Sequence, residues 1–463
     1  MKALADLLKN VETLSLPDSW EANLARIAAE RRYLDEIVAK GEVGIYGVNT
    51  LTGHRDGERL GVEAITRYQQ DLLESHAIDV GADFYDAHAA RCIGYAKLYA
   101  FSAGMSGVST ALFQLIGPLA ANPDFQPRDP RNCSYSSGDV IPAAHWARAA
   151  LAQLARDHGY IAQPGEAMAL INGNFIQTGY AASLCKNLKT AWLFFLELCA
   201  VSNTASRANS ANLHHIVTPQ RPLASAAIDY VRSRSRAIDK DIQDPVSVRA
   251  VPQVIDLLAL AIEEFLQELD TLLQAPSGNP LYSPCEPRPL SQASFLAATL
   301  TARASTLIDA LLFAMWAMVG RTTHVLSGAV EGIPRDAANP SSSLGLIQYP
   351  KLMMSILERA RMDNGRRPYS AGASTSYGTE DLWNHGLSVL GQLENLLQDF
   401  LLANACERFV FSYLDKHLEL GLAEDHELVR RVPDGTSLKA SIPMINAHIE
   451  NSGLGARVGL FPV

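Results

Sequence analysis

The short run Ser136-Ser137-Gly138 has the composition of a backbone that can close on itself. Attack of the Gly138 amide nitrogen on the Ser136 carbonyl would close a five-membered ring. Loss of two waters, one from the Ser137 hydroxyl, would leave an exocyclic methylene, which is a strong electrophile. Glycine suits the attacking position because a Cβ would obstruct so tight a backbone. Taken alone, the triplet is equally well explained as a serine-rich helix N-cap with Asp139 in the first turn.

The residues around the triplet favour the ring. The segment 135–145 resembles the prosthetic-group segment of the histidine and aromatic amino-acid ammonia-lyase family, in which Ala-Ser-Gly, followed by Asp, Pro and His, forms methylidene-imidazolone (MIO). Ser136 stands where the family usually has Ala, whose side chain is not consumed. Further family motifs follow in the family's order: Tyr46-Gly47-Val48-Asn49-Thr50, Ser75-His76-Ala77, Leu170-Ile171-Asn172-Gly173, Gln243-Asp244-Pro245-Val246-Ser247-Val248-Arg249, Asn279-Pro280-Leu281 and Thr379-Glu380-Asp381. The resemblance covers residues 40–410 and identifies the chain as a divergent member of the family.

The resemblance implies a catalytic role for several matching residues. Residues 136–138 would form the MIO electrophile, with no metal. Tyr46 would be the base that removes the β-proton, for which a phenol needs a lowered pKa. Asn172 would donate a hydrogen bond to the ring or the substrate, and Arg249 would clamp the substrate carboxylate. Without the family context, a lone Tyr is more often a packing residue, a lone Arg a surface charge, and Asn-Gly a turn.

Four more residues resemble substrate-binding positions of the family: His76, Gln243, Gln292 and Glu380. His76 and Glu380 resemble the pair that the histidine-selective branch uses around an imidazole. A buried carboxylate that accepts a hydrogen bond from a substrate N–H rejects an analogue that lacks it. The alternative is a packed core histidine and a glutamate at a helix start.

The chain also departs from the family pattern. Val246 replaces the tyrosine of Gln-Asp-Pro-Tyr-Ser, so that either another hydroxyl compensates or activity is lost. The segment 51–57 adds charge to the loop after Tyr46, and the segment 290–294 keeps Gln292 but lacks the family's Phe. Because these changes cluster at the predicted pocket, we expect an altered substrate or reaction outcome.

Composition restricts the class of protein. The chain has 463 residues, 48% of them hydrophobic, and its net charge of −10 argues against a nucleic-acid or anionic-membrane partner. Its six cysteines have no CxxC spacing, which favours reduced thiols over disulfides or a zinc site. The first residues lack the apolar core of a signal peptide. We therefore expect a cytoplasmic protein, and the resemblance implies an enzyme that acts on a small-molecule amino acid.

Helical periodicity dominates the chain and predicts a mainly α protein. The segments 302–319 and 387–411 are Ala- and Leu-rich and free of proline, which is typical of helices buried in a bundle or an interface. The resemblance implies a long central bundle of the aromatic ammonia-lyase and fumarase-aspartase type. It divides the chain into an MIO-bearing region, 1–205, and a bundle region, 206–463. It also implies a homotetramer whose active sites are shared between subunits.

Three functions are compatible with these residues. The leading hypothesis is an MIO-dependent ammonia-lyase that converts an aromatic or imidazole α-amino acid, histidine or an analogue, to an α,β-unsaturated acid. A 2,3-aminomutase would use the same ring and return the ammonia at Cβ. A relative without activity would keep the fold for binding or assembly. The sequence alone does not distinguish a free from a carrier-tethered substrate.

Overall fold

Helices form nearly all the regular structure of the chain. The computed structural model describes residues 1–79, 81, 83–131, 138–217, 221–338, 345–365, 386–430 and 437–451. Within these ranges there is no strand, only four isolated β-bridges. The predicted mainly α fold class is confirmed.

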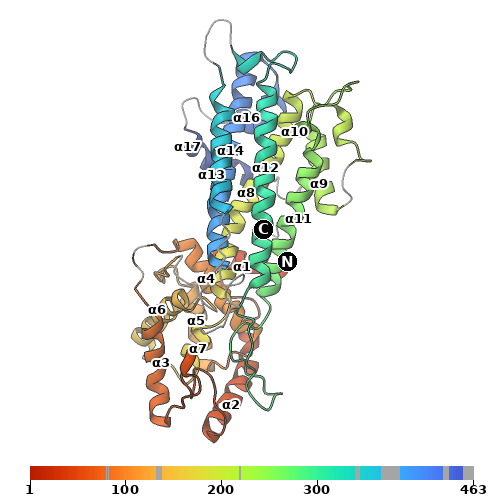
Figure 1. Cartoon of the computed structure of the whole chain (residues 1–463). Coiled ribbons are helices and arrows are strands. Elements are labelled where there is room, and N and C mark those ends of the chain that lie inside the picture. Colours follow the sequence, from red (N-terminus) through yellow and green to blue (C-terminus); the bar gives the residue numbers. More distant parts are fainter. Residues whose placement is uncertain are drawn as a thin grey trace.

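Five long helices run side by side as a bundle (Figure 1): α8 (Phe175–Ala205), α11 (Val251–Leu272), α12 (Ala298–Val325), α13 (Gln348–Asn364) and α14 (Gly386–Leu418). The predicted helices at 302–319 and 387–411 lie inside α12 and α14. The α8 helix is apolar on every face, and it is buried along most of its length between α4, α11 and α14. The predicted boundary after residue 205 coincides with the end of α8, but α8 itself is one of the bundle helices. The division into two regions therefore stays a prediction.

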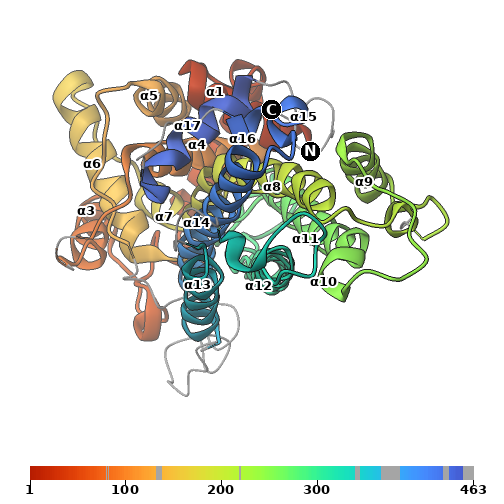
Figure 2. The ribbon, with the colours of Figure 1, turned by 90° about the horizontal axis from the view of Figure 1, so that it is seen from above.

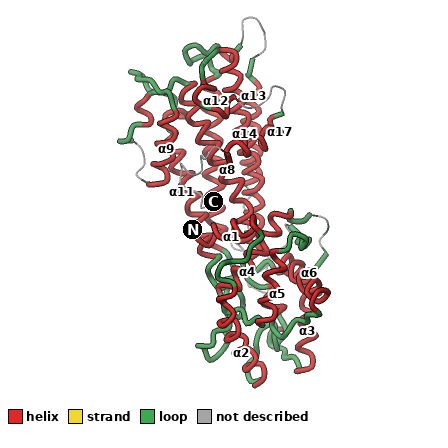
Figure 3. The backbone as a smooth tube through the Cα atoms, turned by 180° about the vertical axis from the view of Figure 1, so that it is seen from behind, coloured by secondary structure: helices red, strands yellow, loops and turns green. Residues whose placement is uncertain are grey.

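The N-terminal helices gather around one end of the bundle (Figures 1 and 3): α1 (Lys2–Thr13), α2 (Leu24–Lys40), α3 (Val62–His76), α4 (Ala87–Ala103), α5 (Thr110–Ala121), α6 (Val140–His158) and α7 (Glu166–Ile171). We call this the junction end. The α8 and α12 helices begin there, and α4 packs along α8 to join the two parts. Short 3-10 turns occur at Glu21–Asn23, Gly53–Arg55, Ser210–Leu213 and Arg335–Ala337.

The opposite end of the bundle, which we call the far end, holds α9 (Pro222–Arg234) and α10 (Val246–Arg249) on one side (Figure 2). The α10 helix packs on α12 near Gly320. The last helices, α15 (Leu422–Asp425), α16 (Glu427–Arg430) and α17 (Leu438–Asn451), lie against α14 and α8.

A buried ion pair ties the bundle together. Arg321 on α12 donates to Glu407 on α14 through Nε (2.6 Å) and Nη2 (2.7 Å), and Nη1 lies 3.2 Å from Sγ of Cys199 on α8. Both charged side chains are at most 1% exposed, and such pairs are costly to break because one buried charge is left alone. The α12 helix is long and apolar enough to cross a membrane, but 56% of its most apolar window is buried within the fold, as in the core helix of a soluble protein.

Candidate active site

Gly138 lies at the junction end, where three helices begin. It precedes α6 by two residues, and a Cβ built on it would lie 3.8 Å from the carbonyl oxygen of Gly173, just before α8. The same Cβ would lie 3.6 Å from Phe295, just before α12. Helix N-termini carry partial positive charge. The three helix starts therefore favour negative charge near Gly138, as expected for a site that stabilises an anionic group.

The backbone at Gly138 also suits a tight turn. Its φ is +86°, in the left-handed region that favours glycine, and the next residue, Asp139, has a φ of +50°. Asp139 is buried, and its carboxylate accepts a hydrogen bond of 2.7 Å from Nε2 of Gln177 on α8. The ring segment therefore ends in a backbone that α8 holds in place. Ser136 and Ser137 lie outside the described residues.

Tyr46 lies in a loop that its own asparagine stabilises. Asn49 is buried, its side-chain oxygen accepts from the Ile45 amide (2.6 Å), and its Nδ2 donates to the Val43 carbonyl (2.9 Å). The half-buried Tyr46 phenol accepts a hydrogen bond of 3.2 Å from the Gly53 amide. This hydrogen bond from a backbone donor holds the Tyr46 hydroxyl in place. The Asn of the motif thus shapes the loop, and the charged segment after it contributes a donor to the predicted base.

Asn172 is connected to the Tyr46 loop through one methionine. It ends α7 and is 9% exposed. Its Nδ2 lies 3.7 Å from Sδ of Met168 on the preceding turn. The Met168 side chain also fills the space beside Gly47, where a Cβ would lie 2.2 Å from its Cε. The predicted base loop and the predicted donor therefore both contact the Met168 side chain.

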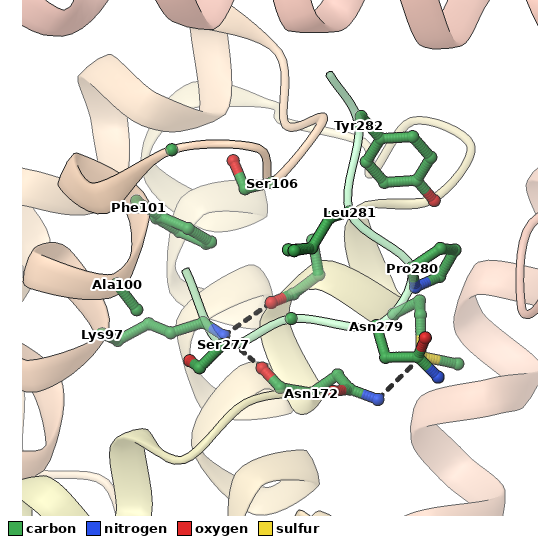
Figure 4. Close-up of a pocket in the computed structure, with 14 residues that line it drawn as sticks. Lys97, Ala100, Phe101, Ser106, Asn172, Ser277, Asn279, Pro280, Leu281 and Tyr282 are labelled. Carbon is green, nitrogen blue, oxygen red and sulfur yellow. Dashed lines mark hydrogen bonds between the residues drawn. The ribbon is translucent and has the colours of Figure 1, made fainter. Parts of the chain in front are cut away.

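A small cavity lies beside Asn172 (Figure 4). It is lined by Lys97, Ser106, Asn172, Ser277 and Asn279, among others, and its volume of about 20 Å³ has room for about one water molecule. Among the described residues, Oδ1 of Asn172 has no hydrogen-bond partner. The cavity therefore combines apolar walls with a few polar side chains, one of which is a buried group without a partner among the described residues.

Gln292 holds a loop together at the junction end. Its side-chain Nε2 donates to the Gly278 carbonyl, and its side-chain Oε1 accepts from the backbone N–H of Ser294. Its backbone N–H donates to Oδ1 of Asn279 (3.1 Å). Its amide group is thus used by the backbone of its own loop. Its predicted contact with a substrate stays a prediction.

His76 is the last residue of α3 and is half-buried. Its Nδ1 lies 2.8 Å from the Leu72 carbonyl and 3.0 Å from Oγ of Ser75. A carbonyl can only accept, so Nδ1 carries the proton and Nε2 of the neutral ring is the acceptor. His76 can accordingly accept a hydrogen bond from a ligand. Glu380, its predicted partner, lies outside the described residues.

Arg249 and Gln243 lie at the far end, remote from the residues above. Arg249 ends α10 and donates to Oε1 of Gln243, which is exposed. Val246, on the same helix, is 62% exposed. Since α10 packs beside Gly320, and the span from Ala298 to Gly320 is about 33 Å at 1.5 Å per residue, no side chain can join the two ends within one chain.

Two residues at the junction end were missed by the sequence reasoning. Lys97 is the one basic residue of the apolar segment 92–103 of α4. Its isolated charge in this segment could have marked it as a candidate site residue from the sequence. Phe295 follows the segment in which the family's Phe seemed lost, and its ring packs beside Gly138. An aromatic side chain is thus present at the site. In the described part of the chain, no three His, Cys, Asp or Glu side chains are grouped to hold a metal ion.

Comparison with known proteins gives consistent sequence matches. The profile of a family described as aromatic amino acid lyase matches residues 4–409. The histidine ammonia-lyase of Paracidovorax citrulli is 27% identical over 287 residues, covering 56% of this chain and 55% of that protein. The enzyme of the same name from Yersinia enterocolitica is 30% identical over 297 residues, or 58% of each. The chain thus spans little more than half the length of these curated relatives that it matches.

Solved structures share the fold over nearly the whole chain. A tyrosine aminomutase from Streptomyces globisporus has a TM-score of 0.78 at 18% identity, covering 95% of this chain and 93% of that one. An ergothioneine-degrading enzyme from Treponema denticola has a TM-score of 0.82 at 17% identity, covering 97% of both. Histidine ammonia-lyase from Trypanosoma cruzi has a TM-score of 0.78 at 20% identity, covering 94% and 89%. At these identities the likeness concerns the fold alone.

Proposed function

Because the chain belongs to the aromatic amino acid lyase family, we propose that it is an ammonia-lyase. Its substrate is an aromatic or imidazole L-α-amino acid, from which it eliminates ammonia to yield an α,β-unsaturated acid. The observation that carries this proposal is the convergence of the starts of α6, α8 and α12 on Gly138. An elimination that passes negative charge to an electrophile at residue 138 needs such an environment.

The electrophile in this proposal is MIO, formed by Ser136, Ser137 and Gly138. It supplies an electrophilic methylene that takes up the substrate amine and turns it into a leaving group. Gly138 fits this group because its φ of +86° lies in the left-handed region that favours glycine. The nearby helix starts would hold the developing negative charge.

The other residues of the junction end then have distinct tasks. Tyr46 removes the β-proton, and the Gly53 amide, which donates to its oxygen at 3.2 Å, positions the hydroxyl. Asn172 donates a hydrogen bond to the ring or substrate from a buried position, where such a bond is stronger than in water. His76 contacts the substrate side chain through Nε2, with Glu380 as its partner. Gln292 contributes from the neighbouring loop.

Arg249 and Gln243 serve the site of another copy of the chain. Arg249 is required to bind the substrate carboxylate, yet it lies at the far end, about 33 Å along α12 from the junction. In a homotetramer, the far end of one subunit can meet the junction end of another. Arg249 then binds the substrate carboxylate in the active site of the neighbouring subunit. We expect the assembled enzyme to be soluble and cytoplasmic.

The intact mass of the purified chain tests the ring. We expect it to be lower than the sequence mass by two waters. Ser137→Ala should restore one of these waters or prevent ring closure, whereas the matched Ser136→Ala should keep the full deficit, because that side chain is not consumed. A wild-type chain with its full sequence mass would contradict the MIO proposal.

Product analysis tests the reaction. With L-histidine, L-phenylalanine and L-tyrosine as candidate substrates, we expect free ammonia and a conjugated acid in equal amounts. A β-amino acid without net ammonia would instead identify an aminomutase. If the ring is present and no aromatic or imidazole amino acid is converted, the lyase proposal is wrong, and the Val246 replacement becomes the first suspect.

A further inference from the structure

Lys97 is a buried lysine that the proposed reaction does not use. It lies on α4, is 1% exposed, and has no carboxylate partner among the described residues. Lysine is rarely buried without such a partner, since its charge loses hydration. Burial accordingly moves the pKa of Lys97 well below its usual value. A methionine would fill the same space at lower cost, so the ammonium group requires a reason.

The hydrogen bonds of Lys97 are both at the break between α7 and α8. Its Nζ donates to the carbonyl of Ala169 (2.5 Å) and to the carbonyl of Asn172 (2.9 Å), as Figure 4 shows for Asn172. The ammonium also lies 4.3 Å from the ring centre of Phe175, the first residue of α8. The carbonyls at a helix C-terminus lack partners within the helix and carry partial negative charge. Lys97 donates to two such carbonyls: that of Ala169 in the last turn of α7, and that of Asn172, the C-cap residue of the same helix.

These contacts hold the peptide that joins two parts of the site. The Asn172 carbonyl belongs to the peptide bond with Gly173, whose own carbonyl lies beside Gly138. Gly173 has a φ of +118°, a backbone conformation that favours glycine. On its other side, a Cβ on Gly173 would lie 2.9 Å from Oγ of Ser277. Lys97 and Ser277 therefore both contact the turn between the predicted donor and the predicted ring.

We propose that Lys97 is a positioning residue: its ammonium fixes the Asn172–Gly173 peptide, and thereby aims the Asn172 side chain and the Gly173 carbonyl at the reacting groups. This rests on the proposed function for its catalytic consequence, but not for the contact itself. Two N–H groups of Lys97 are used by carbonyls. Oδ1 of Asn172 has no partner among the described residues. Lys97 and Asn172 both line the same small cavity.

The test compares three variants in the full-length enzyme. Lys97→Met keeps the length of the side chain and removes the donor and charge. Lys97→Gln keeps an N–H donor without charge, and it also serves if the methionine variant does not fold. Tyr95→Phe is the matched control, since it removes from the same helix a buried hydroxyl that has no partner among the described residues.

The first readout is hydrogen exchange of peptides covering residues 166–177. We expect faster exchange in Lys97→Met, a smaller change in Lys97→Gln, and wild-type exchange in Tyr95→Phe. The second readout is the split between kcat and KM. We expect kcat of Lys97→Met to fall on the order of 100-fold, as for a misplaced reacting group, with a much smaller change in KM.

Unchanged exchange in both Lys97 variants would overturn the contact, and accelerated exchange with wild-type kcat would overturn its catalytic role. The wild-type mass and product assays separate this from the proposed function. A wild-type chain without ring or turnover refutes the lyase proposal and the catalytic role of Lys97 with it, while hydrogen exchange still tests whether Lys97 fixes residues 172 and 173.

Discussion

At the junction end, the polar residues of the candidate site are buried and engaged within their own chain. Asn172 is 9% exposed, Lys97 donates to two carbonyls, and Asn49 holds the Tyr46 loop. At the far end, Arg249 and Gln243 hydrogen-bond each other beside Val246, which is 62% exposed. The predicted site residues of the junction end are therefore held in place by contacts within one chain. The far end offers a guanidinium and an amide outward, as expected of residues that complete a site on another subunit.

The largest expected effects come from disabling each end in turn. Tyr46→Phe should lower kcat by about 10²–10⁴-fold, because it removes the base, while the mass deficit of two waters remains. Arg249→Ala should raise KM, because the carboxylate loses a charge-assisted partner. When the two variants are co-expressed, mixed oligomers should regain activity, since some sites then combine an intact Tyr46 with an intact Arg249. Steady-state kinetics of the purified mixture measures the recovery.

Each variant expressed alone and then mixed after purification, without subunit exchange, is the control for this complementation. If co-expression gives only the summed activity of the two variants, then both residues act from one chain. The assignment of the far end to a neighbouring subunit would then be wrong. Full activity of Tyr46→Phe alone would refute the base.

A smaller effect is expected from Gly47→Ala at the junction end. The new Cβ would lie 2.2 Å from Cε of Met168, and φ at this position is +69°, so that backbone strain of about 1–3 kcal/mol is added. We expect kcat to fall, because Met168 also contacts Asn172. We also expect the free energy of unfolding to drop by about the added strain, 1–3 kcal/mol. Kinetics and chemical denaturation measure both. Gly41→Ala, at φ +66° with open space around it, is the control for strain without the clash.

The smallest effect is expected from Gly320→Ala at the far end. A Cβ there would lie 2.8 Å from Cβ of Ser247 and would push α10 away from α12. We expect KM to rise several-fold with kcat nearly unchanged, because α10 carries Arg249 and no base. A fall in kcat with constant KM would contradict this assignment, because it would show that the far end takes part in the chemical step rather than in substrate binding.

Sequence reasoning captured the elements whose signals are local. The helices at 302–319 and 387–411 are confirmed because long, proline-free apolar runs form buried helices in almost any context. The ordered motifs led to a family that the match over residues 4–409 confirms.

Other features could not be derived in this way. The contact of Lys97 with the Asn172 carbonyl joins residues 75 positions apart, and the packing of Phe295 on Gly138 joins segments still further apart. Periodicity and motif spacing carry no information on such distances. The replacement of the family's Phe was therefore overstated, since an aromatic ring reaches the site from the next residue along the chain.

The sequence by itself determined which residues are available for chemistry and that long helices carry them, because residue type and helical period are local properties. Only the tertiary structure decided which of these residues meet. It brought the starts of three helices to Gly138 and joined the Tyr46 loop to Asn172 through Met168. It also kept Arg249 away from both, because a rigid helix of 28 residues separates the two ends of the bundle.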